Sequence, residues 1–182
     1  TDGNQIADDL IDGGIFPGSF NPIHSGHLSL AAIAEKILRT EISYEISLSN
    51  VDKSSLSEEE LFHRLSNIGN ERSVIITRAP TFVEKAKLFP GCTFVLGADT
   101  AKRLLDKKYY NGVESEVFSA MEEIKSKGCK FLVAGRAIDD EYFTTLNDLT
   151  ISEGFRPLFQ GISEPEFRDD VSSSFLRNQG DY

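Results

Sequence analysis

The sequence predicts an α/β fold, in which a doubly wound, Rossmann-like parallel sheet is flanked by helices in a single domain. Short apolar runs alternate along the chain with stretches whose apolar residues recur at helical spacing, and this alternation is typical of parallel sheets. Several apolar runs lead into glycine-containing segments. In such folds, segments at the carboxyl ends of strands bind ligands. A chain of 182 residues suits one domain of this kind.

The elements of the first half are indicated by local patterns. The apolar run Gly13–Phe16 predicts a strand, and His27–Leu38 predicts a helix because its apolar residues fall on one face. Glu41–Ser49 alternates apolar and polar residues, as a strand does. Ser57 and Glu60 have the spacing of a capping box, which predicts the start of a second helix.

The second half continues the alternation. The elements expected there are, in order, a strand over Ser73–Thr77, a short helix capped by Thr81 and ending at Phe89, a strand over Thr93–Gly97, a helix ending at Lys107 and Lys108, a helix ending at Gly128, a strand over Lys130–Gly135 and the start of a last helix over Ser172–Arg177.

Composition argues against two classes of partner. The net charge of −10 disfavours a nucleic-acid polymer or an anionic membrane, and no apolar run approaches the roughly 20 residues of a membrane-spanning helix. Two cysteines, Cys92 and Cys129, do not form a disulfide framework, so we expect a cytoplasmic protein with both thiols in the core. The polar segment 1–12 and the absent initial Met predict a linker to an upstream domain. Homo-oligomer formation is left open.

The segment Gly18–Leu30, GSFNPIHSGHLSL, places two histidines in a turn between a strand and a helix. The first turn of a helix has unpaired N–H groups and the positive end of the helix dipole, so it suits an anion. Gly26 lets the backbone approach a ligand, and His24 and His27 can donate hydrogen bonds to phosphate oxygens. A zinc site would need further ligands at suitable spacing, so we expect no metal site. Simple packing of the two rings is the remaining alternative.

Two motifs resemble the signatures of the nucleotidylyltransferase superfamily. FNPIHSGH is similar to the HxGH signature, and Val171–Arg177, VSSSFLR, is similar to ISSTxxR. The second motif has Val in place of Ile and Ser174 in place of Thr, which keeps a β-branched anchor and a hydroxyl. The resemblance implies a nucleotidylyltransferase domain over residues 13–182.

Within that superfamily, the chain resembles nicotinate and nicotinamide mononucleotide adenylyltransferases. GADTAKRLLDKKYY (97–110) is similar to their GADS-type segment, and RAPTFVEKAKLFPG (78–91) and NVDK (50–53) extend the similarity. His24 also favours this branch, because phosphopantetheine adenylyltransferases usually have Thr at that position. Some similar proteins carry the domain fused to another one.

One residue type of that subfamily is absent. Its members generally stack the pyridine ring on a Trp after the GADS segment, whereas this chain contains no Trp. Tyr109 and Tyr110 follow the segment at about the same offset. We therefore expect one of them to take over part of the stacking.

The resemblance implies transfer of AMP from ATP, accompanied by Mg²⁺, to the phosphate of a pyridine mononucleotide, with release of pyrophosphate. His24 and His27 would hold the α- and β-phosphates, and Arg177 would clamp the β- and γ-phosphates. One alternative is a nucleotidylyltransferase for another phosphorylated acceptor, either an enzyme that uses CTP or one that uses phosphopantetheine as the acceptor. The other alternative is a nucleotide-binding module without catalysis. The other residues expected to bind nucleotide are Gly18, Ser19, Phe20, Gly26, Gly97, Asp99, Arg136, Ser172 and Ser173, and those expected to bind the acceptor are Lys53, Tyr109 and Tyr110.

Three of these residues have a simpler alternative role. Lys53 could be a solvated loop lysine, and Asp99 could cap a helix. Arg136 follows a strand in the segment AGRAID, where contact with nucleotide and contact with solvent are equally compatible with the sequence.

Overall fold

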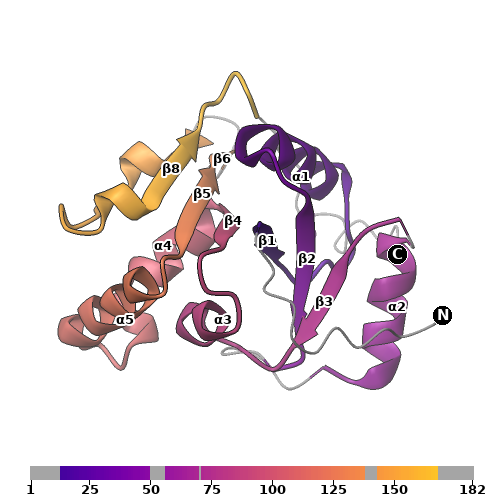
Figure 1. Ribbon diagram of the computed structural model, residues 1–182, viewed down its shortest axis with the longest axis horizontal. Coiled ribbons are helices and arrows are strands. Elements are labelled where there is room, and N and C mark those ends of the chain that lie inside the picture. The colour runs from indigo at the N-terminus through magenta and orange to yellow at the C-terminus, as the bar shows by residue number, and fades with distance from the viewer. Residues whose placement is uncertain (1–12, 50–55, 70, 138–142, 168–182) are drawn as a thin grey trace.

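A computed structural model describes residues 13–49, 56–69, 71–137 and 143–167, and these form a three-layer α/β/α domain (Figure 1). Its six-stranded sheet has the order β3-β2-β1-β4-β5-β8, and every pairing in it is parallel. The fold class predicted from the sequence is therefore confirmed. The predicted linker over residues 1–12 lies outside the described residues.

The strands of the sheet are β1 (Gly14–Pro17), β2 (Ile42–Ser47), β3 (Val74–Thr77), β4 (Thr93–Gly97), β5 (Lys130–Ala134) and β8 (Phe159–Ile162), and β6 (Arg136–Ala137) pairs antiparallel with β7 (Phe143–Thr144). The helices are α1 (Ser25–Leu38), α2 (Glu58–Ile68), α3 (Phe82–Leu88), α4 (Ala98–Leu105) and α5 (Glu114–Ser126), with 3₁₀ turns η1 (Lys107–Tyr109), η2 (Leu146–Asp148) and η3 (Arg156–Leu158).

The order of the strands determines where a ligand can bind. The chain builds the sheet outward from β1 to β3 and then returns to place β4 on the other side of β1. The connections after β1 and β4 therefore lead away from each other, and such a reversal leaves a crevice at the carboxyl ends of the strands. The histidine-containing turn follows β1, so it lies at this crevice.

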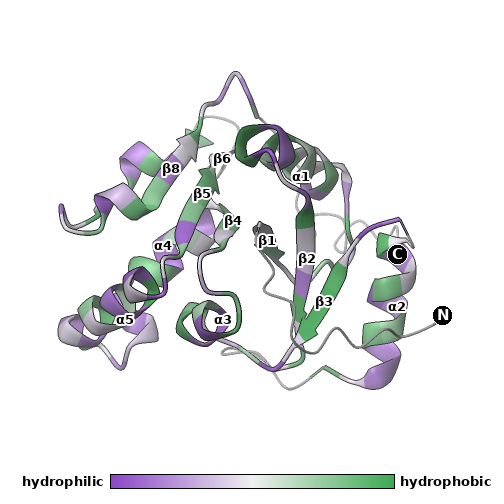
Figure 2. Cartoon of the chain, in the orientation of Figure 1, coloured by the Kyte–Doolittle hydropathy of each residue, from purple (hydrophilic) through white to green (hydrophobic). Residues whose placement is uncertain are grey.

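Each face of the sheet has its own hydrophobic core. Figure 1 shows α1 and α2 on one face and α3, α4 and α5 on the other. Side chains alternate between the two cores along each strand: Phe16 of β1 and Leu132 of β5 pack on the α1 side, whereas Ile15 and Phe131 pack on the opposite side. Because both faces are covered, the strands are mostly hydrophobic, and β2 contains a hydrophilic stretch (Figure 2).

That hydrophilic stretch contains a buried ion pair. Glu45 of β2 is 1% exposed, and its carboxylate lies 2.7 Å from Nζ of Lys85, a 5% exposed residue of α3. The Thr77 hydroxyl donates to the same carboxylate at 2.5 Å, and Lys85 Nζ also donates to the Ala79 carbonyl at 2.6 Å. Burial lowers the pKa of Lys85, an effect that Glu45 opposes. The polar groups of the pair are therefore satisfied by each other and by the chain around them.

Most predicted elements are found within a few residues of their expected bounds. The capping boxes of α2 at Ser57 and of α3 at Thr81 are present, and Gly128 has the positive φ of 73° that ends α5. Cys92 and Cys129 are buried and free, as expected. Among the described helices, none combines the length and the apolar character needed to cross a membrane.

Three features differ from the expectation. The helix expected from His27 begins two residues earlier, at Ser25, and α4 ends at Leu105, where the sequence predicted a helix to Lys107 and Lys108. A separate 3₁₀ turn, η1, follows α4 because the Asp106 carboxylate accepts a hydrogen bond from the Lys108 N–H. β8 and the β6–β7 ribbon have no counterpart in the sequence prediction.

Replacing Lys85 by Met should lower the free energy of unfolding by about 3–5 kcal/mol, because the Glu45 carboxylate is then buried without its cation. The double variant Glu45→Gln/Lys85→Met should recover more than half of this loss, since no unpaired charge remains. Urea unfolding of the three proteins measures both effects. A Lys85→Met protein as stable as the wild type would contradict the assignment of a buried, charged pair.

Candidate active site

The turn after β1 is held from three sides. The Gly18 N–H donates to the Glu45 carbonyl at 3.0 Å and extends the β1–β2 ladder, and Nη1 of Arg64 in α2 donates to the Ser19 carbonyl at 3.1 Å. Phe20, which has a φ of 43°, is 1% exposed. A Cβ atom on Gly18 would lie 2.6 Å from the Phe20 ring, so only glycine fits there. The backbone of the turn is therefore fixed before any ligand binds.

The two histidines stand together at the start of α1. His24 is the N-cap, His27 lies in the first turn, and their ring centroids are 3.8 Å apart with the planes inclined at 35°. The His27 ring also meets the Phe20 ring edge-to-face at 5.1 Å. Both histidines are half-buried at the end of the helix that carries the free N–H groups. This is the arrangement that suits an anion.

The environment of His27 determines its protonation. Burial lowers the pKa of His27 from 6.5 to about 3, with smaller contributions from the neighbouring His24 and Arg136. Nδ1 of His27 accepts a hydrogen bond from the His24 backbone N–H at 3.2 Å. The hydrogen bond thus assigns the ring proton to Nε2. At neutral pH, His27 is an uncharged donor.

Asp99 and Arg136 form an ion pair at the ends of β4 and β5. Gly97 is the N-cap of α4, Asp99 lies in the first turn of that helix, and Arg136 begins β6. Arg136 Nη1 lies 2.5 Å from Asp99 Oδ2, and the two side chains are 42% and 40% exposed. Because the charge of Arg136 also lowers the pKa of His27, the ends of β1, β4 and β5 contribute to one site. Partial exposure leaves both side chains accessible to a nucleotide.

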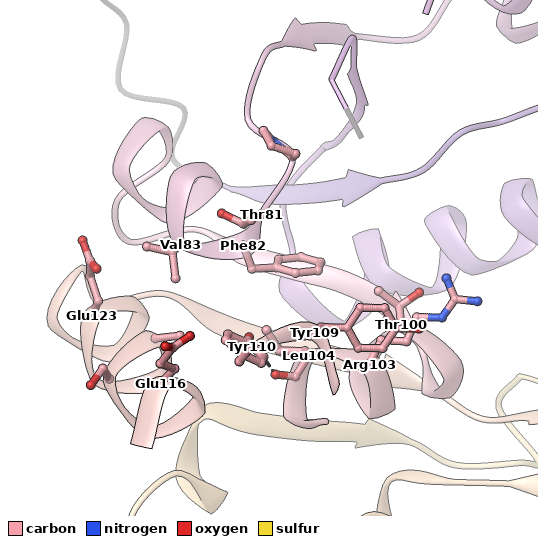
Figure 3. A pocket seen from close by; sticks show the side chains of 13 residues that line it. Thr81, Phe82, Val83, Thr100, Arg103, Leu104, Tyr109, Tyr110, Glu116 and Glu123 are labelled. Atoms are coloured by element: carbon pink, nitrogen blue, oxygen red, sulfur yellow. Dashed lines mark hydrogen bonds between the residues drawn. The ribbon is translucent and has the colours of Figure 1, made fainter. Parts of the chain in front are cut away.

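A pocket of about 510 Å³ lies on the α3–α5 side of the sheet (Figure 3). Aromatic side chains form much of its wall, and Figure 3 shows Phe82 facing the region of Tyr109 and Tyr110. Thr100, the residue after Asp99, also lines it. The full set of lining residues is Pro80, Thr81, Phe82, Val83, Thr100, Arg103, Leu104, Tyr109, Tyr110, Glu116, Ser119, Ala120 and Glu123.

The two tyrosines differ in how they are held. The Tyr110 hydroxyl donates to the Leu104 carbonyl at 2.9 Å, and burial raises the pKa of Tyr110. Tyr109 is half-buried, and Lys108 Nζ lies 5.9 Å from the centre of its ring. Tyr110 is therefore anchored to the last turn of α4, and Tyr109 has the ring better placed to contact a ligand.

The structure brings the histidine pair, Asp99 and Arg136 together, whereas Tyr109 and Tyr110 line the pocket, to which none of those four residues contributes. The histidine turn, the Asp99–Arg136 pair and the tyrosine pocket follow the carboxyl ends of the strands, but the buried Phe20 side chain holds the turn and is not exposed to a nucleotide. Sequence reasoning missed Arg64 and Phe82, for which only a position on a helix was visible. The predicted residues that lie outside the described part of the chain are Lys53, Ser172, Ser173 and Arg177.

No group of three or more His, Cys, Asp or Glu side chains within the described ranges could hold a metal ion. Asp99, the carboxylate of the crevice, is paired with Arg136.

Comparison with known proteins agrees with this geometry. The profile of the family described as cytidylyltransferase-like matches residues 15–179. The chain is also 32% identical over 108 residues to a phosphopantetheine adenylyltransferase of Mycoplasma capricolum, a match that covers 56% of this chain and 74% of the relative. With its parallel sheet and its histidine turn at the strand-order reversal, the chain belongs to the cytidylyltransferase-like family of the nucleotidyltransferase superfamily.

Proposed function

We propose that this nucleotidyltransferase is an adenylyltransferase, which moves AMP from MgATP to the phosphate of a small acceptor and releases pyrophosphate. The observation that carries the proposal is the His24–His27 pair at the start of α1, together with a pocket that has aromatic lining residues on the α3–α5 side of the sheet. The first feature suits the phosphates of ATP, and the second suits an acceptor with a flat or apolar part.

The reaction needs charge neutralisation more than acid–base chemistry. An oxygen of the acceptor phosphate attacks the α-phosphorus, and the bond between that phosphorus and the oxygen leading to pyrophosphate breaks. The attacking oxygen is already anionic, so neither a general base nor a covalent enzyme intermediate is required. Catalysis then depends on orienting the two phosphates and stabilising the equatorial oxygens of the group in transfer.

The described residues can divide this work. Nε2–H of His27, the His24 ring and the N–H groups of the first turn of α1 would donate to oxygens of the α- and β-phosphates. Arg136 adds a positive charge beside His27, with Asp99 holding its guanidinium. From the sequence resemblance, Arg177, Ser172 and Ser173 would bind the triphosphate tail and Lys53 the acceptor phosphate.

Two acceptors follow from different observations. The name of the Mycoplasma relative supports phosphopantetheine, which the sequence analysis kept as the alternative, better than it supports a pyridine mononucleotide. The aromatic wall of Phe82, Tyr109 and Tyr110 supports a flat-ringed acceptor such as nicotinamide or nicotinate mononucleotide. We therefore propose adenylyl transfer with these two acceptor classes as candidates.

Pyrophosphate release tests the proposal. The protein is incubated with ATP or with CTP, each against phosphopantetheine, nicotinamide mononucleotide and nicotinate mononucleotide. The proposal requires release with ATP that depends on one of these acceptors. If pyrophosphate is released with CTP but not with ATP, the nucleotide substrate is CTP. If no combination gives acceptor-dependent release, adenylyl transfer is contradicted.

Replacing His24 or His27 by Ala should lower kcat by about 10²–10³, because each change removes a donor to the phosphate oxygens. His63→Ala is the matched control, since His63 is an exposed histidine of α2. Its turnover should stay within about twofold of the wild type. Near-normal turnover of either His24→Ala or His27→Ala would exclude that side chain from phosphate stabilisation.

His27 should stay neutral through the whole range in which an ordinary histidine titrates. Its folded-state pKa of about 3 lies below the unfolded value of 6.5. Between these values the unfolded chain binds a proton that the folded chain does not, so the free energy of unfolding falls as the pH falls from 6.5 toward 3. Above pH 6.5 this contribution to stability is fully present. NMR titration of the His27 ring nitrogens measures its pKa, and a midpoint near 6.5 would refute the assignment.

Tyr109→Ala should weaken acceptor binding several-fold, since an aromatic contact is worth about 0.5–1.5 kcal/mol. ATP binding should not change. Phe118→Ala is the control, because Phe118 is an exposed aromatic residue of α5 that does not line the pocket. Calorimetric titration with each acceptor measures the effect. Equal acceptor affinity for Tyr109→Ala and the wild type would show that Tyr109 does not contribute to acceptor binding.

A further inference from the structure

The buried pair of Glu45 and Lys85 takes no part in the chemistry described above, although the Glu45 backbone is bonded to the turn that follows β1. Lys85 Nζ donates to both carboxylate oxygens of Glu45, at 2.8 and 2.7 Å, and to the Ala79 carbonyl at 2.6 Å. These three hydrogen bonds use all the donors of an ammonium group. The position of Lys85 is thus determined by three bonds to two other segments of the chain.

On one side, Glu45 is tied to the histidine turn. Its carbonyl accepts the hydrogen bond of the Gly18 N–H at 3.0 Å, at the point where the chain leaves β1. Glu45 is also in register with Pro17 in the parallel β1–β2 pairing. A shift of Glu45 would therefore move the first residue of the turn that leads to the two histidines.

On the other side, Lys85 is tied to the wall of the aromatic pocket. The Ala79 carbonyl accepts from Lys85, and the Ala79 N–H donates to the Thr77 hydroxyl at 3.2 Å. Ala79 is followed directly by Pro80, Thr81 and Phe82, which line the pocket. Both backbone groups of Ala79 are thus bound to the network around Glu45. The start of α3 is therefore held by the Glu45 carboxylate through Lys85 and Thr77, and the backbone carbonyl of the same residue holds the histidine turn.

We propose that Lys85 is a positioning residue, which sets the Phe82 wall of the acceptor pocket relative to the histidine turn. The inference rests on the proposed function only in naming the ligand of the pocket as the acceptor. A dry, fully satisfied network holds two segments in one geometry more rigidly than solvated contacts do. A rigid distance between the two segments is what in-line attack by one bound phosphate on another requires.

A purely structural role makes a different prediction. Apolar side chains of similar volume can replace a buried ion pair with little loss of stability. Such a replacement cannot donate to the Ala79 carbonyl. The double variant Glu45→Gln/Lys85→Met therefore separates the two roles, because it keeps the fold without the link from Lys85 to Ala79.

The experiment compares the wild type, the double variant and Leu132→Ala in steady-state kinetics. Leu132 is fully buried on the α1 side of β5, so its truncation destabilises the domain away from α3. We expect the KM for the acceptor to rise about tenfold in the double variant, with the KM for ATP within about twofold of the wild-type value. Leu132→Ala should leave both constants near wild type. Unchanged acceptor KM in the double variant, or an equal rise in Leu132→Ala, would overturn the positioning role.

Hydrogen exchange provides a readout that does not depend on turnover. The amides of residues 79–84 should exchange at least several-fold faster in the double variant than its change in global stability explains, whereas Leu132→Ala should show only the global effect. Should the wild type transfer AMP to none of the acceptors, the proposed function fails and these amides still decide the positioning role. Protection equal to the wild type after correction for stability would overturn it.

Discussion

A carboxylate placed inside the sheet is the constraint on which the rest of the structure depends. Glu45 occupies a strand position where both faces of the sheet are covered, and an unpaired charge there would destabilise the fold by several kcal/mol. The chain satisfies it with Lys85 from α3 and Thr77 from β3. As a result, β2, β3 and α3 are linked at one point, next to the turn that follows β1.

In the proposed reaction, the site would act through the placement of charge and of hydrogen-bond donors. His27 is kept neutral by burial and holds its proton on Nε2, so its capacity to donate does not change across the physiological pH range. The positive charge is supplied by Arg136, whose guanidinium is oriented by Asp99. Each of these groups follows a different strand, and only the reversal of strand order between β1 and β4 brings them together. The topology is thus a condition of the proposed chemistry.

Features that depend on residues close together in the chain could be predicted from the sequence. Apolar periodicity predicted the sheet and its helices, and the spacing of His24 and His27 in a turn before a helix predicted an anion site. Contacts between distant segments were not predictable in this way. Glu45 and Lys85 are 40 positions apart, and nothing near either residue indicates the other. β8 was missed because its four residues, FQGI, include Gln160 and Gly161 and lack a clear pattern.

The identity of the acceptor could not be predicted from sequence motifs. In the proposed reaction, the histidine turn concerns the nucleotide half. The proposed acceptor site is the pocket lined from α3, α4 and α5, where Phe82 and Tyr109 come from separate elements. A wall assembled from several helices has no single sequence motif. The name of one relative and the aromatic character of the pocket therefore lead to different acceptors.

Isotope tracing tests the central claim, direct transfer of AMP to an acceptor phosphate, most directly. The acceptor is prepared with ¹⁸O in its phosphate, and the products with unlabelled ATP are followed by ³¹P NMR and mass spectrometry. Direct attack predicts that all of the label stays in the product, with one labelled oxygen bridging the two phosphorus atoms, and that the released pyrophosphate is unlabelled. Labelled pyrophosphate, or free AMP with the acceptor unchanged, would contradict it.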